Sequence, residues 1–330
     1  MTRNLKEFVN QHVDVRSVFD IYGPDHVAIL LAHYNGAAML GEQLQSLSAQ
    51  THRDWSLILS DDGSSDAWMD IATDFTKSEP GRRIWLTNGP RRGFAQNFAS
   101  LIALAGPSVP YAAFCDQDDV WCPAKLETAI AALKTVSPGQ PALYCGRTMV
   151  VDQNLQPLHM SPYFARPPDF RNALVQNIGG GNTMVLNRAA LDLLQDTIHH
   201  TDGIVSHDWW TYQLVSGAGG EVIYDPEPHV LYRQHAGNLV GANGGWRARV
   251  ARLLRLLKGE FRAWNTANTA ALEKSKHWLT PEARDTLAQF SKARQGRLGV
   301  RLASLSRSGA YRQTRQGQCA LWLAAWLRKL

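Results

Sequence analysis

The chain of 330 residues is long enough for one large α/β domain and a smaller appendage, with a core that needs no disulfides. Apolar residues make up 45% and charged residues 19% of the chain, which excludes disorder throughout. The four cysteines contain no CxxC pair, so we expect a reducing compartment. We recognise no signal peptide and no apolar run of the ~20 residues that span a bilayer, and therefore expect a cytoplasmic location.

The charge is unevenly distributed along the chain. Residues 246–330 hold 18 Lys and Arg against 4 Asp and Glu, whereas the first 245 residues hold 16 against 25. The composition changes at the glycine-rich segment 241–245. We therefore divide the chain into a lead-in (1–25), an acidic α/β domain (26–243) and a basic helical region (244–330) that faces a polyanion such as anionic lipid.

The predicted elements alternate between strands and helices. The lead-in ends in the turn signal Gly23-Pro24-Asp25. Short apolar runs predict strands at 27–32, 55–60, 84–86 and 111–115, and helical spacing predicts helices at 39–50, 94–105 and 123–133. Further strands are expected at 183–186 and 221–224, with a helix beginning near 206. This alternation predicts a mostly parallel sheet with helices on both faces.

Polar segments follow three of these predicted strands. Segments 35–36, 61–66 and 116–119 come after the first, second and fourth strands. Ligands of such sheets bind beyond the carboxyl ends of the strands. We therefore expect these segments to meet at one edge of the sheet and to form the functional site.

The segment Asp116-Gln117-Asp118-Asp119 places three carboxylates in four positions. Their mutual repulsion is relieved by a cation, and carboxylate oxygens suit Mg²⁺ or Mn²⁺. Such an ion usually shares its ligand shell with substrate phosphates, so a diphosphate ligand is implied. The alternative is an acidic loop that caps the next helix, but three carboxylates exceed what one cap needs.

Two further segments fit a nucleotide diphosphate. Asp62 lies in the turn Asp61-Asp62-Gly63-Ser64, where its carboxylate can accept a hydrogen bond from a base N–H; taken alone, this segment is a turn with a helix cap. Arg92 lies at a predicted helix start, where its guanidinium favours phosphate oxygens. For the neighbouring Arg91 we favour a solvated surface arginine.

The segment His207-Asp208-Trp209-Trp210 combines a carboxylate with aromatic side chains. Asp208 could act as a general base that takes a proton from an acceptor hydroxyl, while the tryptophans stack on sugar C–H groups. Alternatively, Asp208 caps a helix whose tryptophans belong to the core. His235, in Tyr232-Arg233-Gln234-His235, is either a metal or phosphate ligand or an ordinary hydrogen-bonded histidine.

Together these segments resemble the family-2 glycosyltransferases, over residues 27–243. The resemblance is carried, in order, by residues 32–36, 44–51, 60–66, 88–97, 114–121 and 207–210. It implies the α/β GT-A fold, a Rossmann-like architecture that binds nucleotide-diphospho-sugars, followed here by a C-terminal helical section. It also implies a metal-dependent, inverting transfer of a sugar from a nucleotide-sugar donor.

The same resemblance implies roles for individual residues. Asp208 would be the general base, and Asp116 and Asp118 would face the diphosphate and the metal, with Asp118 as the direct metal ligand. His235, considered above from the residue alone, is the third predicted metal ligand. Ala32 stands where many relatives have a hydroxyl residue, so its base contact would use the backbone. The residues implied to bind the donor are Ala32, Tyr34, Asn35, Asp62, Arg92, Asn97, Asp116 and Gln117, and those implied to bind the acceptor are His207, Trp209 and Trp210.

The motif combination resembles the rhamnosyltransferase-like branch, whose members build bacterial surface polysaccharides such as O-antigen or capsule. The implied donor is dTDP-rhamnose, with a UDP-hexose as the alternative. The implied acceptor is a glycan or a lipid-linked saccharide.

The basic C-terminal region contains two stretches, 246–258 and 319–330, in which apolar and basic residues alternate at helical spacing. Such helices can lie in an anionic membrane interface, which would place the protein on the inner face of the cytoplasmic membrane. They can equally pack on the α/β domain or form a homodimer contact. The sequence leaves these interpretations open.

Two other functions compete with glycosyl transfer. A sugar nucleotidyltransferase would share the fold and the metal, but we find no glycine-rich loop with Lys or Arg after the first strand. A catalytically dead scaffold that binds a membrane or polyanion is opposed by the intact carboxylates. The basic region carries no nucleic-acid recognition motif, so no nucleic-acid partner is expected.

Overall fold

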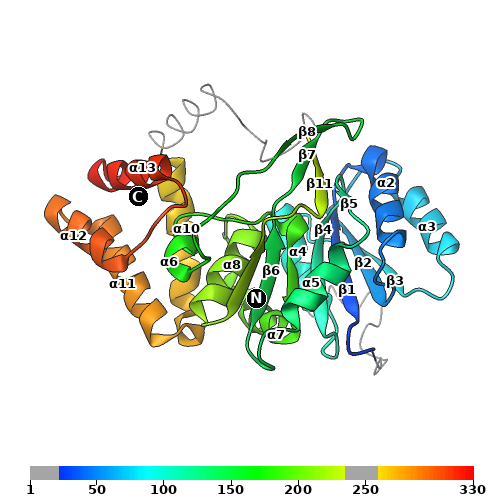
Figure 1. Cartoon of the computed structure of the whole chain (residues 1–330), viewed down its shortest axis with the longest axis horizontal. Coiled ribbons are helices and arrows are strands. Elements are labelled where there is room, and N and C mark those ends of the chain that lie inside the picture. The colour runs from blue at the N-terminus through cyan, green and yellow to red at the C-terminus, as the bar shows by residue number, and fades with distance from the viewer. Residues whose placement is uncertain (1–21, 235–258) are drawn as a thin grey trace.

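A seven-stranded sheet forms the centre of the computed structural model, which describes residues 22–234 and 259–330 (Figure 1). Its strand order is β10-β6-β9-β4-β1-β2-β3. Every neighbouring pair is parallel except those of β9, which runs antiparallel to both β4 and β6. The predicted mostly parallel sheet is therefore confirmed. Its strands are β1 (Val27–His33), β2 (Trp55–Asp61), β3 (Ile84–Asn88), β4 (Tyr111–Asp116), β6 (Ala142–Gly146), β9 (Val185–Asn187) and β10 (Glu221–Asp225).

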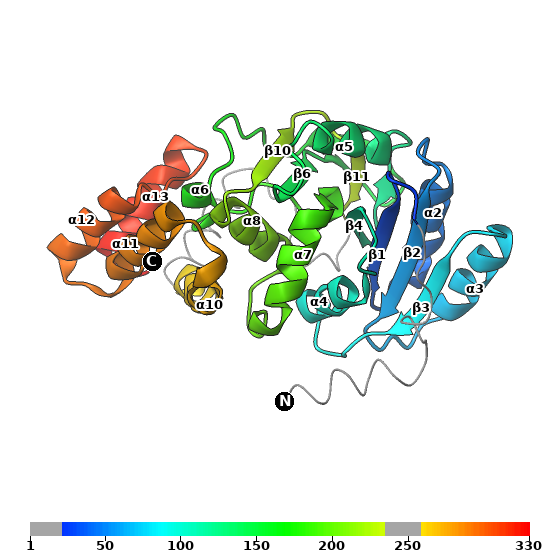
Figure 2. The same cartoon turned by 90° about the horizontal axis from the view of Figure 1, so that it is seen from below.

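Helices cover both faces of this sheet, as predicted (Figure 2). One face packs on α2 (Ala37–Ser48), α3 (Trp68–Ser78) and α5 (Lys125–Leu133), and the other on α4 (Phe94–Leu104), α7 (Arg188–Thr197) and α8 (His207–Gly217). Within β1, Ile29 belongs to the first of these apolar clusters and Leu30 to the second. Because both faces are buried, β1 reads as an unbroken apolar run.

A second, four-stranded sheet has the order β5-β11-β7-β8. It brings β5 (Val120–Trp121), directly after the acidic turn, beside β11 (Val230–Arg233), which also pairs with β7 (Met149–Val151). The fourth strand is β8 (Pro157–Met160). The sequence did not predict this sheet, because strands of two to four residues are too short to show a period. It also missed α3, β6, α7 and the short α6 (Phe170–Ala173).

The C-terminal region is helical and lies at the end of the molecule away from β3 and α3 (Figures 1 and 2). It comprises α10 (Glu260–Lys274), α11 (Pro281–Gln295), α12 (Leu298–Ser308) and α13 (Arg315–Trp326). Leu272, Phe290 and Leu321 belong to the same apolar cluster as residues of α8. The inner sides of these helices therefore extend the core. This agrees with the expectation that C-terminal helices can pack on the α/β domain.

Several predictions on the ends of the domains lie outside the described residues. These include most of the lead-in, the boundary at 243/244 and the basic stretch 246–258. Within 22–234 and 259–330, no helix is long and apolar enough to cross a membrane.

Helix α13 offers a matched pair of leucines for testing how this region is attached. Leu321 is 1% exposed, whereas Leu323 is 40% exposed. We expect Leu321→Ala to lower the free energy of unfolding by about 2–4 kcal/mol, because it leaves a cavity in the core. Leu323→Ala should change it by less than about 0.5 kcal/mol. Urea denaturation measures both; equal losses would contradict the assignment of the inner face.

Candidate active site

The parallel strands end in register at one edge of the sheet. His33 of β1 pairs with Asp61 of β2, and Asp61 pairs with Asn88 of β3. On the other side of β1, Ala32 pairs with Asp116 at the end of β4. The register therefore brings the loops after β1, β2 and β4 together, as the sequence predicted.

Four carboxylates interact electrostatically at this edge. Burial, followed by the charges of Asp119, Asp118 and Asp208, raises the pKa of Asp116 well above its usual range. Burial and the charge of Asp118 raise the pKa of Asp119 to about 8, although hydrogen bonds from Asn182 and Arg233 oppose the shift. The first turn of α8 packs against the end of β4, because the ring of His207 meets that of Phe114 edge-on at 4.9 Å. Residues more than 80 positions apart in the sequence thus share one acidic site.

The acidic site is compatible with a divalent ion without forming a complete cage. Among residues 22–234 and 259–330, no group of three or more His, Cys, Asp or Glu side chains could hold a metal by itself. His235, the third predicted ligand, lies outside the described residues. Mg²⁺ needs only one or two protein carboxylates when substrate phosphates and waters complete its shell. The repelling carboxylates of Asp116 and Asp118 fit such a partial ligand set.

Two residues predicted to contact the donor join loops to one another. Gln117 uses both ends of its amide on the backbone of Tyr34: its Oε1 accepts from the N–H (2.6 Å) and its Nε2 donates to the C=O (2.9 Å). Asn35 accepts the backbone N–H of Ser65 through its Oδ1 (2.9 Å). Both side chains therefore tie the β1 loop to its neighbours, and their contact with the donor stays a prediction. The Tyr34 side chain is 58% exposed, and Ala32 is partly exposed beside Asp116.

The two aspartates after β2 organise the loops on their own side of the site. Asp62 accepts the backbone N–H groups of Arg91 (2.6 Å) and Gly93 (2.7 Å). Asp61 pairs with Nδ1 of His33 (3.1 Å) and accepts from the hydroxyl of Ser64. Burial alone would raise the pKa of Asp61, but these hydrogen bonds outweigh it and lower the pKa. Asp62 therefore holds the loop before α4, and a base N–H would have to use its remaining lone pairs.

The two residues around the start of α4 that were predicted to bind the nucleotide-sugar donor differ in exposure. Arg92 is exposed and forms an ion pair with Asp202 (3.3 Å), a contact that contributes little stability at a surface. Asn97 is buried, donates to the C=O of Ser60 (2.9 Å) and accepts from its hydroxyl (2.6 Å). Asn97 therefore joins α4 to β2 and is not available to contact the nucleotide-sugar, so that prediction is wrong.

His207 lies in the core rather than facing an acceptor. Its ring stacks on Phe98, with centroids 3.7 Å apart, and meets the ring of Phe114 edge-on at 4.9 Å. A Cβ at Gly181 would lie 2.3 Å from Nε2 of His207, so only glycine fits there. Burial lowers the pKa of His207 to about 4, against the opposing charge of Asp208.

The neighbouring tryptophans are also core residues, as the alternative interpretation of this segment held. Trp209 is 7% exposed and donates from its indole to the C=O of Ala173 (2.6 Å), and Trp210 is 1% exposed. Because these tryptophans and His207 are buried, they are not available to stack on an acceptor sugar, and that prediction is wrong. Asp208 is the partly exposed member of the segment. Its buried neighbours fix the first turn of α8 and present Asp208 at the sheet edge.

Sequence reasoning missed three buried polar residues beside the acidic turn. Arg233 donates from Nε to the C=O of Asp118 (3.0 Å), and Asn182 donates to the carboxylate of Asp119. Lys125 is buried with its Nζ 3.1 Å from the ring centroid of Trp121. The segment 232–235 was singled out for its histidine, so a signal for Arg233 was present.

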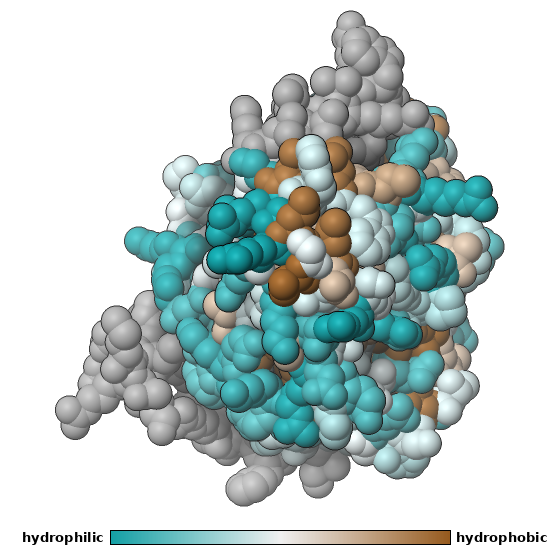
Figure 3. All heavy atoms as spheres, turned by 90° about the vertical axis from the view of Figure 1, so that its left-hand side faces the viewer, coloured by the Kyte–Doolittle hydropathy of each residue, from teal (hydrophilic) through white to brown (hydrophobic). Residues whose placement is uncertain are grey.

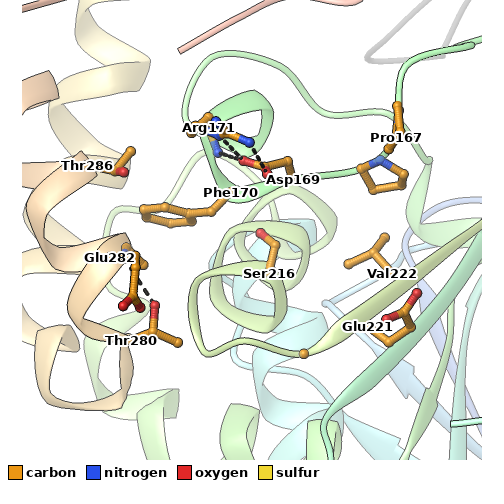
Figure 4. Close-up of a pocket in the computed structure, with 13 residues that line it drawn as sticks. Pro167, Asp169, Phe170, Arg171, Ser216, Glu221, Val222, Thr280, Glu282 and Thr286 are labelled. Carbon is orange, nitrogen blue, oxygen red and sulfur yellow. Dashed lines mark hydrogen bonds and ion pairs between the residues drawn. The ribbon is translucent and has the colours of Figure 1, made fainter. Parts of the chain in front are cut away.

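A cavity of about 470 Å³ lies at the seam between the sheet domain and α11, away from the acidic site (Figure 4). Ser216 at the end of α8, Glu221 at the start of β10 and Thr280 before α11 line it. Asp169 and Arg171, joined by an ion pair (2.8 Å), form another wall. Asp208 is at the other end of α8, about 12 Å along the helix axis. This cavity therefore plays no part in chemistry at Asp208.

The buried His207 predicts a pH dependence of stability. Its pKa is about 4 in the folded chain, against 6.5 for an ordinary histidine, so the unfolded chain binds the proton first as the pH falls. Stability present above pH 6.5 is then lost towards pH 4, by up to about 3 kcal/mol. We expect urea denaturation to show a steeper loss over this range for the wild type than for His207→Asn. Parallel curves would contradict the neutral, buried state of His207.

Comparison with known proteins agrees with this arrangement. The model of the family described as "Glycosyl transferase family 2" matches residues 28–192. A dTDP-rhamnosyl transferase, RfbG of Shigella flexneri, is 31% identical over 235 residues, which cover 68% of this chain and 78% of that protein. The Escherichia coli protein WfgD, a UDP-Glc:alpha-D-GlcNAc-diphosphoundecaprenol beta-1,3-glucosyltransferase, is 30% identical over 168 residues, covering 50% of this chain and 62% of its own.

Among solved structures, residues 1–349 of S. aureus TarS in complex with UDP superpose with a TM-score of 0.55. The match covers 92% of this chain and 88% of that one, at 12% identity. The same fragment with UDP-GlcNAc gives a TM-score of 0.51 at the same identity and coverage. At this identity the likeness concerns the fold.

Proposed function

Because this chain belongs to glycosyl transferase family 2 and has the GT-A fold, it is a glycosyltransferase, and we propose that it performs a metal-dependent, inverting transfer from a nucleotide-sugar. The observation that carries the proposal is the packing of the first turn of α8, which bears Asp208, against the end of β4, where the ring of His207 meets that of Phe114 edge-on at 4.9 Å. This packing brings the partly exposed carboxylate of Asp208 to the edge that holds the proposed metal ligands of the donor diphosphate. An inverting transfer needs a base on one side of the reacting carbon and the departing diphosphate on the other.

The proposed reaction is a single displacement. Asp208 takes the proton of the acceptor hydroxyl while that oxygen bonds to the anomeric carbon of the donor. The bond from this carbon to the diphosphate oxygen breaks on the opposite face, and the nucleoside diphosphate leaves with the electron pair. Asp116 and Asp118 are the proposed ligands of Mg²⁺ or Mn²⁺, which when bound offsets the charge on the departing diphosphate. Arg92, exposed before α4, adds positive charge at the donor side.

The relatives guide the proposal for donor and acceptor. We propose dTDP-rhamnose as the donor, on the likeness to the Shigella flexneri dTDP-rhamnosyl transferase, with a UDP-hexose as the alternative. A lipid-linked acceptor is supported by the name of the Escherichia coli relative, which acts on a diphosphoundecaprenol-linked sugar. Such a transfer would serve the synthesis of a bacterial surface polysaccharide, such as O-antigen or capsule.

Two substitutions separate the proposed roles of the carboxylates. Asp208→Asn should lower the transfer rate by about 10²–10⁴-fold, the usual contribution of a general base, while donor binding is retained. Asp118→Ala should abolish metal-dependent donor binding. Product release in a coupled assay and calorimetry with UDP and dTDP, each with and without Mn²⁺, measure the two effects. Loss of donor binding in folded Asp208→Asn, with unchanged turnover per bound donor, would exclude the base role, and release of pyrophosphate would indicate nucleotidyl transfer.

A lipid-linked acceptor would be reached at a membrane surface, and the C-terminal helices carry a surface that fits one. Five large apolar side chains on α12 and α13 are between 37% and 56% exposed: Leu298, Val300, Trp322, Leu323 and Trp326. Figure 3 shows this end of the molecule with an apolar patch bordered by hydrophilic residues. Residues 286–330 contain nine Lys and Arg and no Asp or Glu. We propose that this α12–α13 surface docks on anionic lipid, which attracts its cations and accepts its tryptophans.

Vesicle flotation tests this docking. Trp326→Glu should lower the fraction bound to phosphatidylglycerol vesicles by about tenfold, because it removes one buried apolar anchor and adds a repelled charge. The matched control is Met69→Glu, since Met69 is 47% exposed on α3, at the opposite end of the molecule. Equal binding of both variants, or a patch that instead holds a homodimer in sedimentation, would contradict the membrane proposal.

A further inference from the structure

Arg233, the last residue of β11, is 4% exposed and contacts three separate parts of the chain. Its Nε donates to the C=O of Asp118 (3.0 Å) and its Nη1 to the C=O of Gln153 (2.7 Å). Its Nη2 forms an ion pair with the carboxylate of Glu42 on α2. A planar guanidinium with fixed donor directions can hold such a set of groups in one geometry, which a flexible lysine cannot.

The backbone of Arg233 adds a second connection to the acidic turn. Its N–H donates to Oδ1 of Asp119 (3.2 Å), whose carboxylate also accepts from the amide of Asn182. One residue therefore bonds to the main chain of Asp118 and to the side chain of Asp119. The antiparallel pairing of β11 with β5, immediately after this turn, places Arg233 there. The turn is thus held on two sides: it continues directly from β4, and Arg233 of β11 binds it through hydrogen bonds.

We propose that Arg233 is a positioning residue, which orients the turn so that Asp118 faces the donor diphosphate and its metal ion. This inference rests on the proposed function, because it assigns Arg233 to the same site. Groups that orient metal ligands typically change metal affinity by about 10–100-fold when they are mutated. Glu42 takes part in the arrangement from α2, and its side chain is 52% exposed, so it can be altered with little effect on folding.

A purely structural role for Arg233 makes a different prediction. A buried guanidinium that loses its partners destabilises the fold wherever it lies, without a specific effect on metal binding. Arg301 is the matched control in this chain. It is 9% exposed and donates to three carbonyl oxygens, those of Ala325 (2.9 Å), Trp326 (2.9 Å) and Gly296 (3.2 Å), within the C-terminal helices.

The experiment measures binding of UDP and of dTDP by calorimetry, with and without Mn²⁺, for the wild type and for Arg233→Lys, Glu42→Gln and Arg301→Lys. Thermal melting of each variant reports folding. We expect Arg233→Lys to weaken Mn²⁺-dependent binding of the nucleotide by about tenfold or more and to leave metal-free binding unchanged. Glu42→Gln should produce a smaller change in the same direction. Arg301→Lys should lower the melting temperature without altering the Mn²⁺ dependence.

The outcomes distinguish this inference from the proposed function. If the wild type binds these nucleotides without any dependence on Mn²⁺, the metal-dependent function is wrong. If the wild type depends on Mn²⁺ and Arg233→Lys and Glu42→Gln retain the same dependence, the positioning role is wrong. It is also wrong if Arg233→Lys and Arg301→Lys weaken Mn²⁺-dependent binding equally, because a general loss of stability then explains both.

Discussion

The repulsion among carboxylates at the carboxyl edge of the sheet is the interaction on which this account depends. Burial and the charges of neighbouring acidic groups raise the pKa of both Asp116 and Asp119. A folded chain keeps such an arrangement at a cost in stability. In the proposed function, a bound cation would offset that cost and would link the carboxylates to the diphosphate of the donor.

The remainder of the fold positions this cluster. The parallel register of β1, β2 and β4 brings three loops together, and hydrogen bonds of Gln117 and Asn35 join those loops to one another. Asp62 in turn accepts hydrogen bonds from the loop between β3 and α4. On the opposite side, the buried ring of His207 and the buried Trp210 anchor α8. Asp208 is thereby presented by a rigid helix end, so its position relative to the donor site is determined by core packing.

The sequence predicted the sheet, the helices on both faces and the acidic turn. Apolar runs, apolar residues at helical spacing and clustered acidic residues are all visible within a short stretch of the sequence. It did not predict which polar residues point inward. Gln117 and Asn97 have the side chains of ligand contacts, yet both use their amides on backbone groups. The tryptophans after Asp208 are equally apolar whether they face a sugar or the core. The segment of Arg233 was noticed only for its histidine, because the partners of Arg233 lie in the turn after β4, the loop after β7 and α2, which only tertiary structure brings together.

The most direct test is anomalous X-ray diffraction from crystals grown with Mn²⁺ and a nucleoside diphosphate. We expect one manganese peak at the carboxylates of Asp116 and Asp118, beside the phosphates of the nucleotide, with Asp208 across the space left for the sugar. A nucleotide bound elsewhere, or a manganese ion that none of these carboxylates approaches, would contradict the proposed site.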